Sequence, residues 1–539
     1  MCRTSRARSD STETAQLGSH GVNLSEVKSH ADTCASNCRV SGLRSHAFVL
    51  QSTSILRSSL LPSTSSDAPL VLDRRRKHVT STKNAACTNS NNTAVAHGLR
   101  PRRDARRSGR FPRLANQVWS QTHGQRGPRW QIATRRGRGL VAAKAIETGQ
   151  SVLAIPQSLG LTATGLKSSG IAQYVKGFEG WTGETGLIAL QVLWERAQGE
   201  GSKMAPWIAV LPKAEELEMP LFWGKADLTL ADASSTRGIS GFVADVDEDF
   251  AWLSENAFAK HPKVFPADKF GPGDFRWAVG VALSRSFFVD GELRLTPLVD
   301  FANHSSLRGV SEPTGGTTGL FGSKAVVLRA GKKYEEGEEF LVSYGPKGAA
   351  GYLEENGFVP PVSGSEVTCE LEFTISEDDK FFDDKEDILE RVGLRTSSTF
   401  DLTAVGLPDA ELVRFLRLLC VSGDDAFLLE GIFRNEVWDF MNEPVSRPNE
   451  EAINELLATR CEDELKAFSG TAKEEEEIVS GKTEASERQR LCAGVRQGER
   501  MALQMTKSWC ESDSKALDRK EYYQERRLKE LQLDLPWEA

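Results

Sequence analysis

The residues best suited to chemistry lie in two short motifs some forty positions apart. The first motif, Pro297–His304, ends in Asn303 and His304, and the second, Phe340–Pro346, contains Tyr344. An amide, an imidazole and a phenol are hydrogen-bonding groups that can orient a bound molecule. Asn-His and Ser-Tyr-Gly are each common by chance, so neither alone identifies a functional site. Both together, in this order, are a specific signal of one.

A third motif precedes both of these. Arg136-Gly137-Arg138-Gly139, followed by the strand-like Val152–Pro156, resembles the glycine turn and strand that open a SET domain. The region from about Arg135 to Phe358 is therefore similar to SET-domain methyltransferases, and among them to the plant Rubisco large-subunit lysine methyltransferase group. The resemblance implies methyl transfer from S-adenosylmethionine to a lysine of a protein substrate, without a metal.

The resemblance also implies roles for individual residues. Tyr344 is the implied catalytic residue, because its hydroxyl can orient an amine whose pKa has been lowered by desolvation. The implied cofactor-binding residues are Arg136, Gly137, Arg138, Arg285, Asn303, His304 and Phe358. The implied substrate-binding residues are Arg285, Val289, Asp300, Tyr344 and Asn356. In this scheme glycine lets the backbone approach the cofactor, and the Arg285 fork suits a carboxylate.

Two departures from the family pattern concern the lysine channel. Asn356-Gly357-Phe358 stands where the family has Tyr-Gly-Phe, and residues 305–319 contain no aromatic side chain. One aromatic wall of the channel is therefore missing. Lysine remains the expected acceptor. The alternatives are a histidine methyltransferase of the same subfamily and a catalytically silent SET protein that binds a partner.

An α+β fold must position these motifs. Strand patterns at 130–156 and 295–344 flank a helical insertion of about 162–286, in which Leu187, Leu190 and Leu193 form an apolar stripe. After Phe358 the chain is predicted to be mainly helical, and it resembles the family's substrate-binding domain. Amphipathic stretches lie at Asp409–Cys420, Glu450–Phe468 and Glu484–Ser508, and Glu474–Glu477 is predicted to be a solvated helix face or a helix start. The expected domains are 116–360 and 361–539.

Residues 1–115 are rich in Ser, Thr, Asn and Arg and lack any sustained period, which predicts disorder. Their Ser- and Arg-rich composition is typical of a transit peptide, so a plastid location is expected, with cytoplasm or nucleus as alternatives. The basic clusters at 74–77 and 102–107 could instead be a nuclear signal or a nucleic-acid arm.

Composition bounds the remaining possibilities. The net charge is −8 for 539 residues and the body of the chain is acidic, which argues against general nucleic-acid affinity. No apolar run approaches the roughly 18 residues of a membrane span. Nine scattered cysteines without C-x-x-C spacing indicate reduced thiols rather than a zinc site or disulfides. A monomer acting on a protein substrate is expected.

Overall fold

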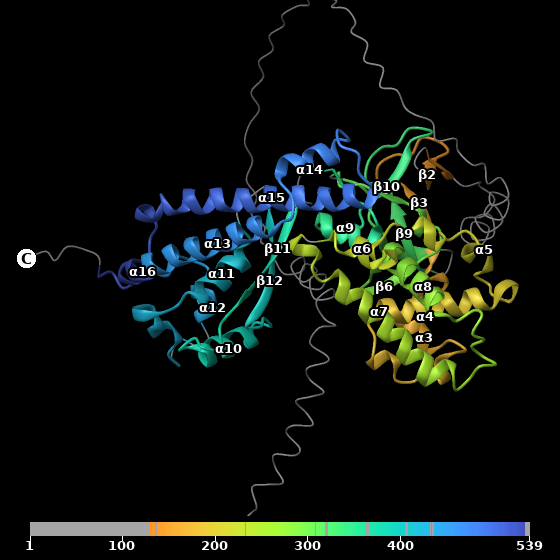
Figure 1. Cartoon of the computed structure of the whole chain (residues 1–539), viewed down its shortest axis with the longest axis horizontal. Coiled ribbons are helices and arrows are strands. Elements are labelled where there is room, and N and C mark those ends of the chain that lie inside the picture. Colours follow the sequence, from red (N-terminus) through yellow and green to blue (C-terminus); the bar gives the residue numbers. More distant parts are fainter. Residues whose placement is uncertain are drawn as a thin grey trace, which may run out of the picture. The chain divides into compact units, whose positions relative to one another are not determined.

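The computed structural model describes residues 130–533, apart from 135–136, 232, 308, 319–321, 362–366, 405–407, 432 and 434–435. The chain divides into two units, Met1–Pro101 and Arg102–Ala539, and all described residues belong to the second. The disorder predicted for residues 1–115 therefore lies outside the described residues. The second unit combines small sheets with many helices (Figure 1), so the predicted α+β class is confirmed.

The strands in the first part of the described chain form three small sheets. One sheet has the order β1 (Trp130–Thr134), β2 (Gly137–Ala142), β10 (Glu339–Val342), β7 (Asn303–His304). A second has the order β3 (Ser151–Pro156), β9 (Ser323–Arg329), β8 (Thr314–Thr318). The third has the order β4 (Leu161–Thr162), β6 (Glu292–Leu295), β5 (Ser286–Val289). Each sheet joins strands from before and after residues 163–285, so that helical segment is an insertion.

The described residues of the insertion form six α-helices. They are α3 (Ala163–Lys167), α4 (Glu184–Ala197), α5 (Ala205–Ile208), α6 (Lys225–Leu228), α7 (Ile239–Leu253) and α8 (Pro272–Arg285). Thr162 begins α3 by accepting a hydrogen bond from the Gly165 amide at 3.0 Å, as N-cap threonines do. The predicted stripe lies on α4, where every residue from Gly186 to Leu193 is buried. A helix that is apolar on most sides is typical of a core position.

The segment Asn356-Gly357-Phe358 lies at the end of a short helix. The helix α9 (Ala349–Asn356) ends at Gly357, whose φ of 76° closes it in the left-handed conformation that glycine adopts without strain. At the other side of the insertion, Asp290 and Gly291 have φ values of 54° and 78° and join β5 to β6 as a two-residue hairpin turn. These turns fix where the strands and helices of the site end.

The C-terminal part is mainly helical, as predicted. Its helices are α10 (Phe382–Arg391), α11 (Ala410–Leu419), α12 (Val437–Phe440), α13 (Arg447–Ala467), α14 (Ala472–Val479), α15 (Glu487–Ser514) and α16 (Tyr523–Glu530). The predicted stretches correspond to α11, α13 and α15. The structure adds an antiparallel pair that was not predicted, β11 (Thr368–Thr374) and β12 (Ser397–Thr403). The signal was present in the sequence, because buried Cys369, Leu371 and Phe373 alternate with more exposed residues.

The prediction of a solvated helix face at Glu474–Glu477 is wrong for one residue. Thr471 and Glu474 do form a capping box at the start of α14. Glu475, however, is only 1% exposed, and its carboxylate pairs with Arg496 at 3.1 Å and Arg500 at 2.8 Å. Burial is possible because two guanidinium groups replace the water that the carboxylate loses.

The helical part contacts the insertion through polar groups. The Arg237 guanidinium pairs with the Glu464 carboxylate at 2.5 and 3.1 Å. In η7 (Ser234–Thr236), the Ser235 amide donates to Glu499 at 3.0 Å, and the Ser235 hydroxyl accepts from the Glu370 amide at 2.9 Å. The insertion, β11 and α15 are thereby joined at one place.

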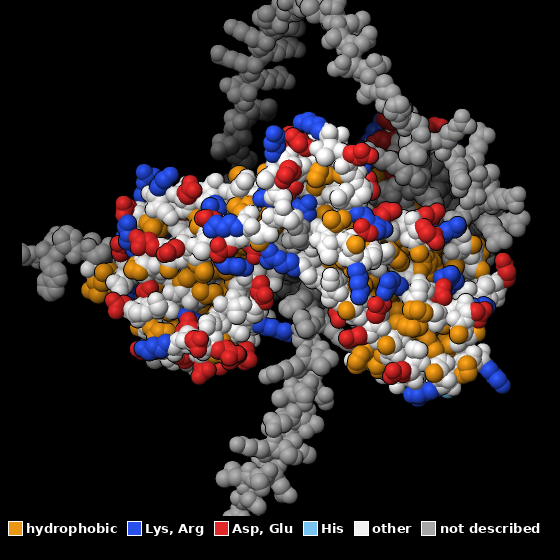
Figure 2. Space-filling view, in the orientation of Figure 1, with side chains coloured by type: hydrophobic (Ala, Val, Ile, Leu, Met, Phe, Trp, Pro, Cys, Tyr) orange, Lys and Arg blue, Asp and Glu red, His pale blue; other side chains and the backbone are white. Residues whose placement is uncertain are grey.

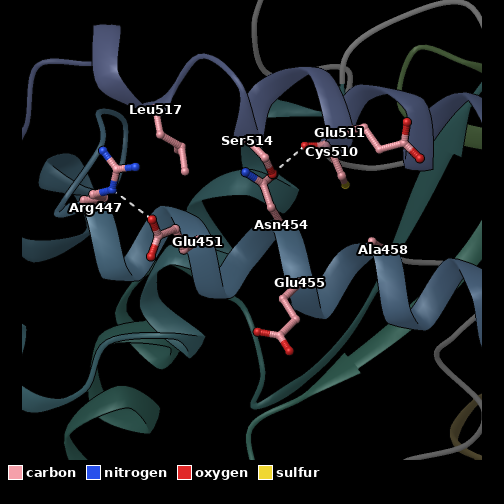
Figure 3. A pocket seen from close by; sticks show the side chains of 9 residues that line it. All are labelled: Arg447, Glu451, Asn454, Glu455, Ala458, Cys510, Glu511, Ser514 and Leu517. Carbon is pink, nitrogen blue, oxygen red and sulfur yellow. Dashed lines mark hydrogen bonds and ion pairs between the residues drawn. The ribbon is translucent and has the colours of Figure 1, made fainter.

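Charged side chains of both signs are spread over the face of the described residues shown in Figure 2. On the face shown in Figure 2, Lys and Arg side chains are interspersed with acidic ones, and acidic side chains gather over α10. A groove of about 380 Å³ lies between α13 and α15 (Figure 3), with the paired Arg447 and Glu451 at one end. None of its lining residues belongs to the predicted site. Among the helices of the described residues, none has the length and apolar character needed to cross a bilayer.

Candidate active site

Two strands bring the first two motifs together. β7 pairs with β10 in parallel, with Asn303 opposite Leu341 and His304 opposite Val342. Tyr344 follows β10 by two residues, and its backbone amide donates to Nδ1 of His304 at 3.2 Å. Since Nδ1 accepts this bond, it carries no proton, and Nε2 lies 3.2 Å from the Ser306 hydroxyl. The structure therefore places Asn303, His304 and Tyr344 side by side.

The Tyr344 hydroxyl faces the same motif. It donates a hydrogen bond to the Ala302 carbonyl at 2.9 Å, which leaves the lone pairs of its oxygen able to accept. Burial raises the pKa of this phenol to about 12; the positive charge of Arg285 opposes the rise, and the negative charges of Asp300 and Glu339 add to it. Tyr344 consequently keeps its proton at neutral pH and is a hydrogen-bonding group rather than a base.

Arg285 is the last residue of α8 and turns toward η9 (Val299–Phe301). Its Nη1 donates to the Asp300 carbonyl at 2.6 Å and lies 3.8 Å from the Asp300 carboxylate. That carboxylate is fully buried and also accepts from Nε1 of Trp207 at 3.2 Å. Asp300 is thus held from two sides, and it keeps Arg285 beside Tyr344.

An aromatic cluster surrounds His304. Its ring lies 5.2 Å from the ring of Tyr344, 4.6 Å from Tyr352 and 5.8 Å from Phe358, measured between centroids. The ring of Phe287 meets Tyr344 edge-on at 5.8 Å. Phe358, which was predicted to bind the cofactor, lies in this cluster. Tyr352 and Phe287 were missed, although each is an aromatic residue within nine positions of a predicted one.

The other predicted site residues lie at different places around the aromatic cluster. Asn356 ends α9 and donates to the Ser284 carbonyl at 3.3 Å, while its oxygen accepts from Lys347 at 3.2 Å. Val289 lies in β5 two residues after Phe287 and is buried, with 2% exposure. The backbone of Gly137 and Arg138 lies in β2, next to β10, whereas Arg136 lies outside the described residues.

The chain is similar in sequence to several known proteins. Residues 376–503 match the family model described as "Rubisco LSMT substrate-binding". The chain is 31% identical over 405 residues to the ribulose-1,5-bisphosphate carboxylase/oxygenase large subunit N-methyltransferase of Nicotiana tabacum, covering 74% of this chain and 80% of that protein. It is 31% identical over 412 residues to the fructose-bisphosphate aldolase-lysine N-methyltransferase of Arabidopsis thaliana, covering 74% and 82%. It is 27% identical over 384 residues to an actin-histidine N-methyltransferase of Danio rerio, covering 68% and 62%.

Solved structures give the same result. The chain matches the SET domain of LSMT bound to lysine and AdoHcy with a TM-score of 0.68 and 27% identity, over 80% of this chain and 97% of that one. It matches Rubisco LSMT bound to AdoMet with a TM-score of 0.65 and 26% identity, over 79% and 97%. The chain therefore belongs to the SET-domain family of the Rubisco large-subunit N-methyltransferases.

Proposed function

We propose that this protein transfers a methyl group from S-adenosylmethionine to the side-chain nitrogen of a lysine in a protein substrate. The observation that carries the proposal is the position of Tyr344, whose hydroxyl donates to the Ala302 carbonyl beside Asn303 and His304. A hydroxyl in this state can accept a hydrogen bond from an amine and so orient its lone pair. Two relatives that are 31% identical to this chain are named as protein N-methyltransferases.

The side chains present fit the cofactor. Nε of Arg285 and Oγ of Ser286 are buried and have no hydrogen-bond partner within the described part of the chain. A buried guanidinium nitrogen without an acceptor suits a carboxylate, which is what the amino-acid end of S-adenosylmethionine offers. Asn303, His304 and Phe358, with the backbone of Gly137 and Arg138, would hold the rest of the molecule. The group it supplies is a methyl on a positively charged sulfur.

The chain's own residues then determine the reaction. Phe287 and Tyr344 meet edge-on, and an amine lying against these rings would be desolvated, which lowers the pKa of a lysine. A neutral amine held there would accept the methyl group as its bond to sulfur breaks, and the resulting ammonium would give its proton to water. Tyr344 contributes by alignment, since displacement requires nitrogen, carbon and sulfur in one line.

Lysine is favoured over histidine by Phe287. Its ring edge next to Tyr344 suits the apolar stem of lysine and offers no hydrogen bond to an imidazole. One observation favours the rival, a protein-histidine N-methyltransferase. Asn356 brings an amide to the end of α9, where it bonds the Ser284 carbonyl and Lys347, and an amide can also bond an imidazole nitrogen.

We further propose that residues 361–539 dock the protein substrate, that the protein acts as a monomer, and that residues 1–115 direct it to the plastid. The family model at 376–503 supports the docking role. The names of the relatives from Nicotiana tabacum and Arabidopsis thaliana include the word chloroplastic, which supports the location.

The test is methylation by the purified protein. Rubisco large subunit, fructose-bisphosphate aldolase and actin are incubated with it and with S-adenosylmethionine carrying a labelled methyl group, and modified residues are identified by mass spectrometry. Label on lysine in any substrate supports the proposal, and label on histidine alone selects the rival. Absence of label together with absence of cofactor binding in calorimetry would point to a catalytically silent binding protein.

A further inference from the structure

Glu339 begins β10 and was not among the residues singled out by the sequence. Its carboxylate accepts a hydrogen bond from Nδ2 of Asn303 at 2.7 Å. The contact follows from the register, because Asn303 lies opposite Leu341 and side chains two residues apart share one face of a strand. Glu339 therefore reaches the side chain that the proposed function assigns to the cofactor.

This hydrogen bond decides how the Asn303 amide is oriented. An ionised carboxylate can only accept, whereas an amide has one donating and one accepting end. The NH₂ group of Asn303 must therefore face Glu339, and its carbonyl oxygen must face the other way. With its donating end bound to Glu339, the amide has its accepting end directed away from the carboxylate.

The charge of Glu339 is a second observation. Within the described part of the chain, no Lys or Arg forms an ion pair with Glu339, although the residue is half-buried. The negative charge of Glu339 also raises the pKa of the Tyr344 phenol, in addition to the effect of burial. A partly buried carboxylate without a cationic partner attracts a positively charged ligand group more strongly than one in water does.

We propose that Glu339 is a positioning residue. It turns the Asn303 carbonyl oxygen toward the ammonium group of the cofactor and supplies a negative charge behind it. The inference rests on the proposed function, because it takes the bound molecule to be S-adenosylmethionine. It assigns Glu339 to the amino-acid end of that molecule and not to its adenosine end.

Calorimetry with two ligands distinguishes contacts to the amino-acid end of the cofactor from contacts to its adenosine end. S-adenosylhomocysteine has the ammonium group, and 5′-methylthioadenosine lacks the whole amino-acid end. Glu339→Ala should weaken S-adenosylhomocysteine binding by about tenfold or more, the usual effect of losing a hydrogen bond to a charged group. Binding of 5′-methylthioadenosine should stay within about twofold of wild type by the same reasoning. Equal weakening of both ligands would mean a general structural defect and would overturn the inference.

Further variants test the route through Asn303. Glu339→Gln keeps an accepting oxygen but not the charge, so its affinity for S-adenosylhomocysteine should lie between those of wild type and Glu339→Ala. In an Asn303→Ala background, Glu339→Ala should have little further effect, since residues that act through one another are not additive. Additive losses would overturn the inference, and they can be measured in the Gln variant if the Ala variant does not fold.

A matched control is the neighbouring acid. Glu338 pairs with Lys332 at 2.6 Å, away from Asn303, so Glu338→Gln should bind S-adenosylhomocysteine as wild type does. If the control weakened binding as much as Glu339→Gln, charge alone rather than position would explain the effect and the inference would fail. If wild type bound neither S-adenosylmethionine nor S-adenosylhomocysteine, the proposed function itself would fail.

Discussion

The ring of Tyr352 lies on the ring of His304, with centroids 4.6 Å apart and planes inclined by 39°. The hydroxyl of Tyr352 donates to the Gly345 carbonyl at 3.0 Å. One side chain of α9 therefore holds both motifs of the site, the Asn-His pair through its ring and the Ser-Tyr-Gly turn through its hydroxyl. Because Tyr352 is only 1% exposed, it would support the proposed cofactor site from behind.

The ring and hydroxyl of Tyr352 can be tested separately. Tyr352→Phe removes one buried hydrogen bond and should lower the free energy of unfolding by about 1 kcal/mol. Tyr352→Ala also removes the ring under His304 and should cost about 3–5 kcal/mol, as large core truncations do. Urea unfolding measures both, and calorimetry should show weaker S-adenosylhomocysteine binding only in the Ala variant. Wild-type affinity in that variant would exclude support of His304 by Tyr352.

Tyr344 should affect turnover rather than binding. Tyr344→Phe keeps the ring packed against Phe287 and His304 but removes the hydroxyl that we propose orients the amine. Turnover should fall by about 10²-fold or more, the scale of a positioned hydroxyl group. Affinity for S-adenosylmethionine, measured by calorimetry, should change little. Unchanged turnover in single-turnover assays would remove Tyr344 from the mechanism.

The sequence predicted the parts of the site that local patterns encode. The glycine motif and the motifs around Asn303 and Tyr344 each carry their own turn or strand signal, and pairing of β7 with β10 brings the latter two together. Helix α15 was predicted from its apolar period and begins at the Ser486 cap. These features depend on neighbours in the chain, which a sequence displays directly.

Other features depend on partners that are distant in sequence. Glu475 stands in a run of four glutamates, and nothing local distinguishes it from its exposed neighbours. Only α15, some twenty residues later, supplies the two arginines that bury it. Tyr352 and Glu339 were missed for the same reason, because their roles come from contacts with His304 and Asn303 across strands and helices.

Asn356 offers a test of acceptor choice. Asn356→Tyr restores the aromatic residue that the family pattern has at this position and removes an amide near Ser284 and Lys347. If lysine is the acceptor, the narrower channel should favour a lower degree of methylation. If histidine is the acceptor, the planar ring loses space and a hydrogen-bonding group, so transfer should stop. Mass spectrometry of lysine and histidine peptides with both proteins distinguishes these results, and histidine methylation by wild type alone would contradict the lysine assignment.

Two partly buried glutamates, Glu354 on α9 and Glu370 on β11, should make the stability of the fold depend on pH. Burial raises the pKa of Glu370 to about 8, and the nearby Asp401, Glu354 and Glu499 add to the rise. Burial and then Glu355 raise the pKa of Glu354 to about 7. Both carboxyls bind protons more tightly in the folded chain than in the unfolded chain, where the pKa is 4.5. Their contribution to stability is therefore complete below about pH 4.5 and is lost as the pH rises through about 7 and 8.

Glu370→Gln should remove part of this dependence, because the amide stays neutral. Its melting temperature should exceed that of wild type at pH 9 by a few degrees, on the order of 2 °C or more, and by less at pH 6. Scanning calorimetry at the two pH values gives the comparison. The control is Glu372→Gln on the same strand, where the side chain is exposed and the shift should be equal at both pH values. A shift for Glu370→Gln that does not change with pH would contradict the role of burial.

Glu475 should be among the carboxylates most important for folding of the helical part. It accepts from Nε of Arg496 and Nε of Arg500, and Arg496 also donates to the Leu230 carbonyl in the insertion at 3.1 Å. Glu475→Ala leaves two partly buried guanidinium groups without their anion, which costs about 3–5 kcal/mol in comparable buried pairs. Glu475→Gln keeps some hydrogen bonding and should cost less.

Glu476→Ala on the same helix is the control, because Glu476 is exposed and pairs only loosely with Lys482, at 3.8 Å. Denaturant unfolding of the three variants should rank Glu475→Ala as the least stable by a wide margin, and equal stability of the Glu475→Ala and Glu476→Ala variants would show that the buried carboxylate contributes nothing.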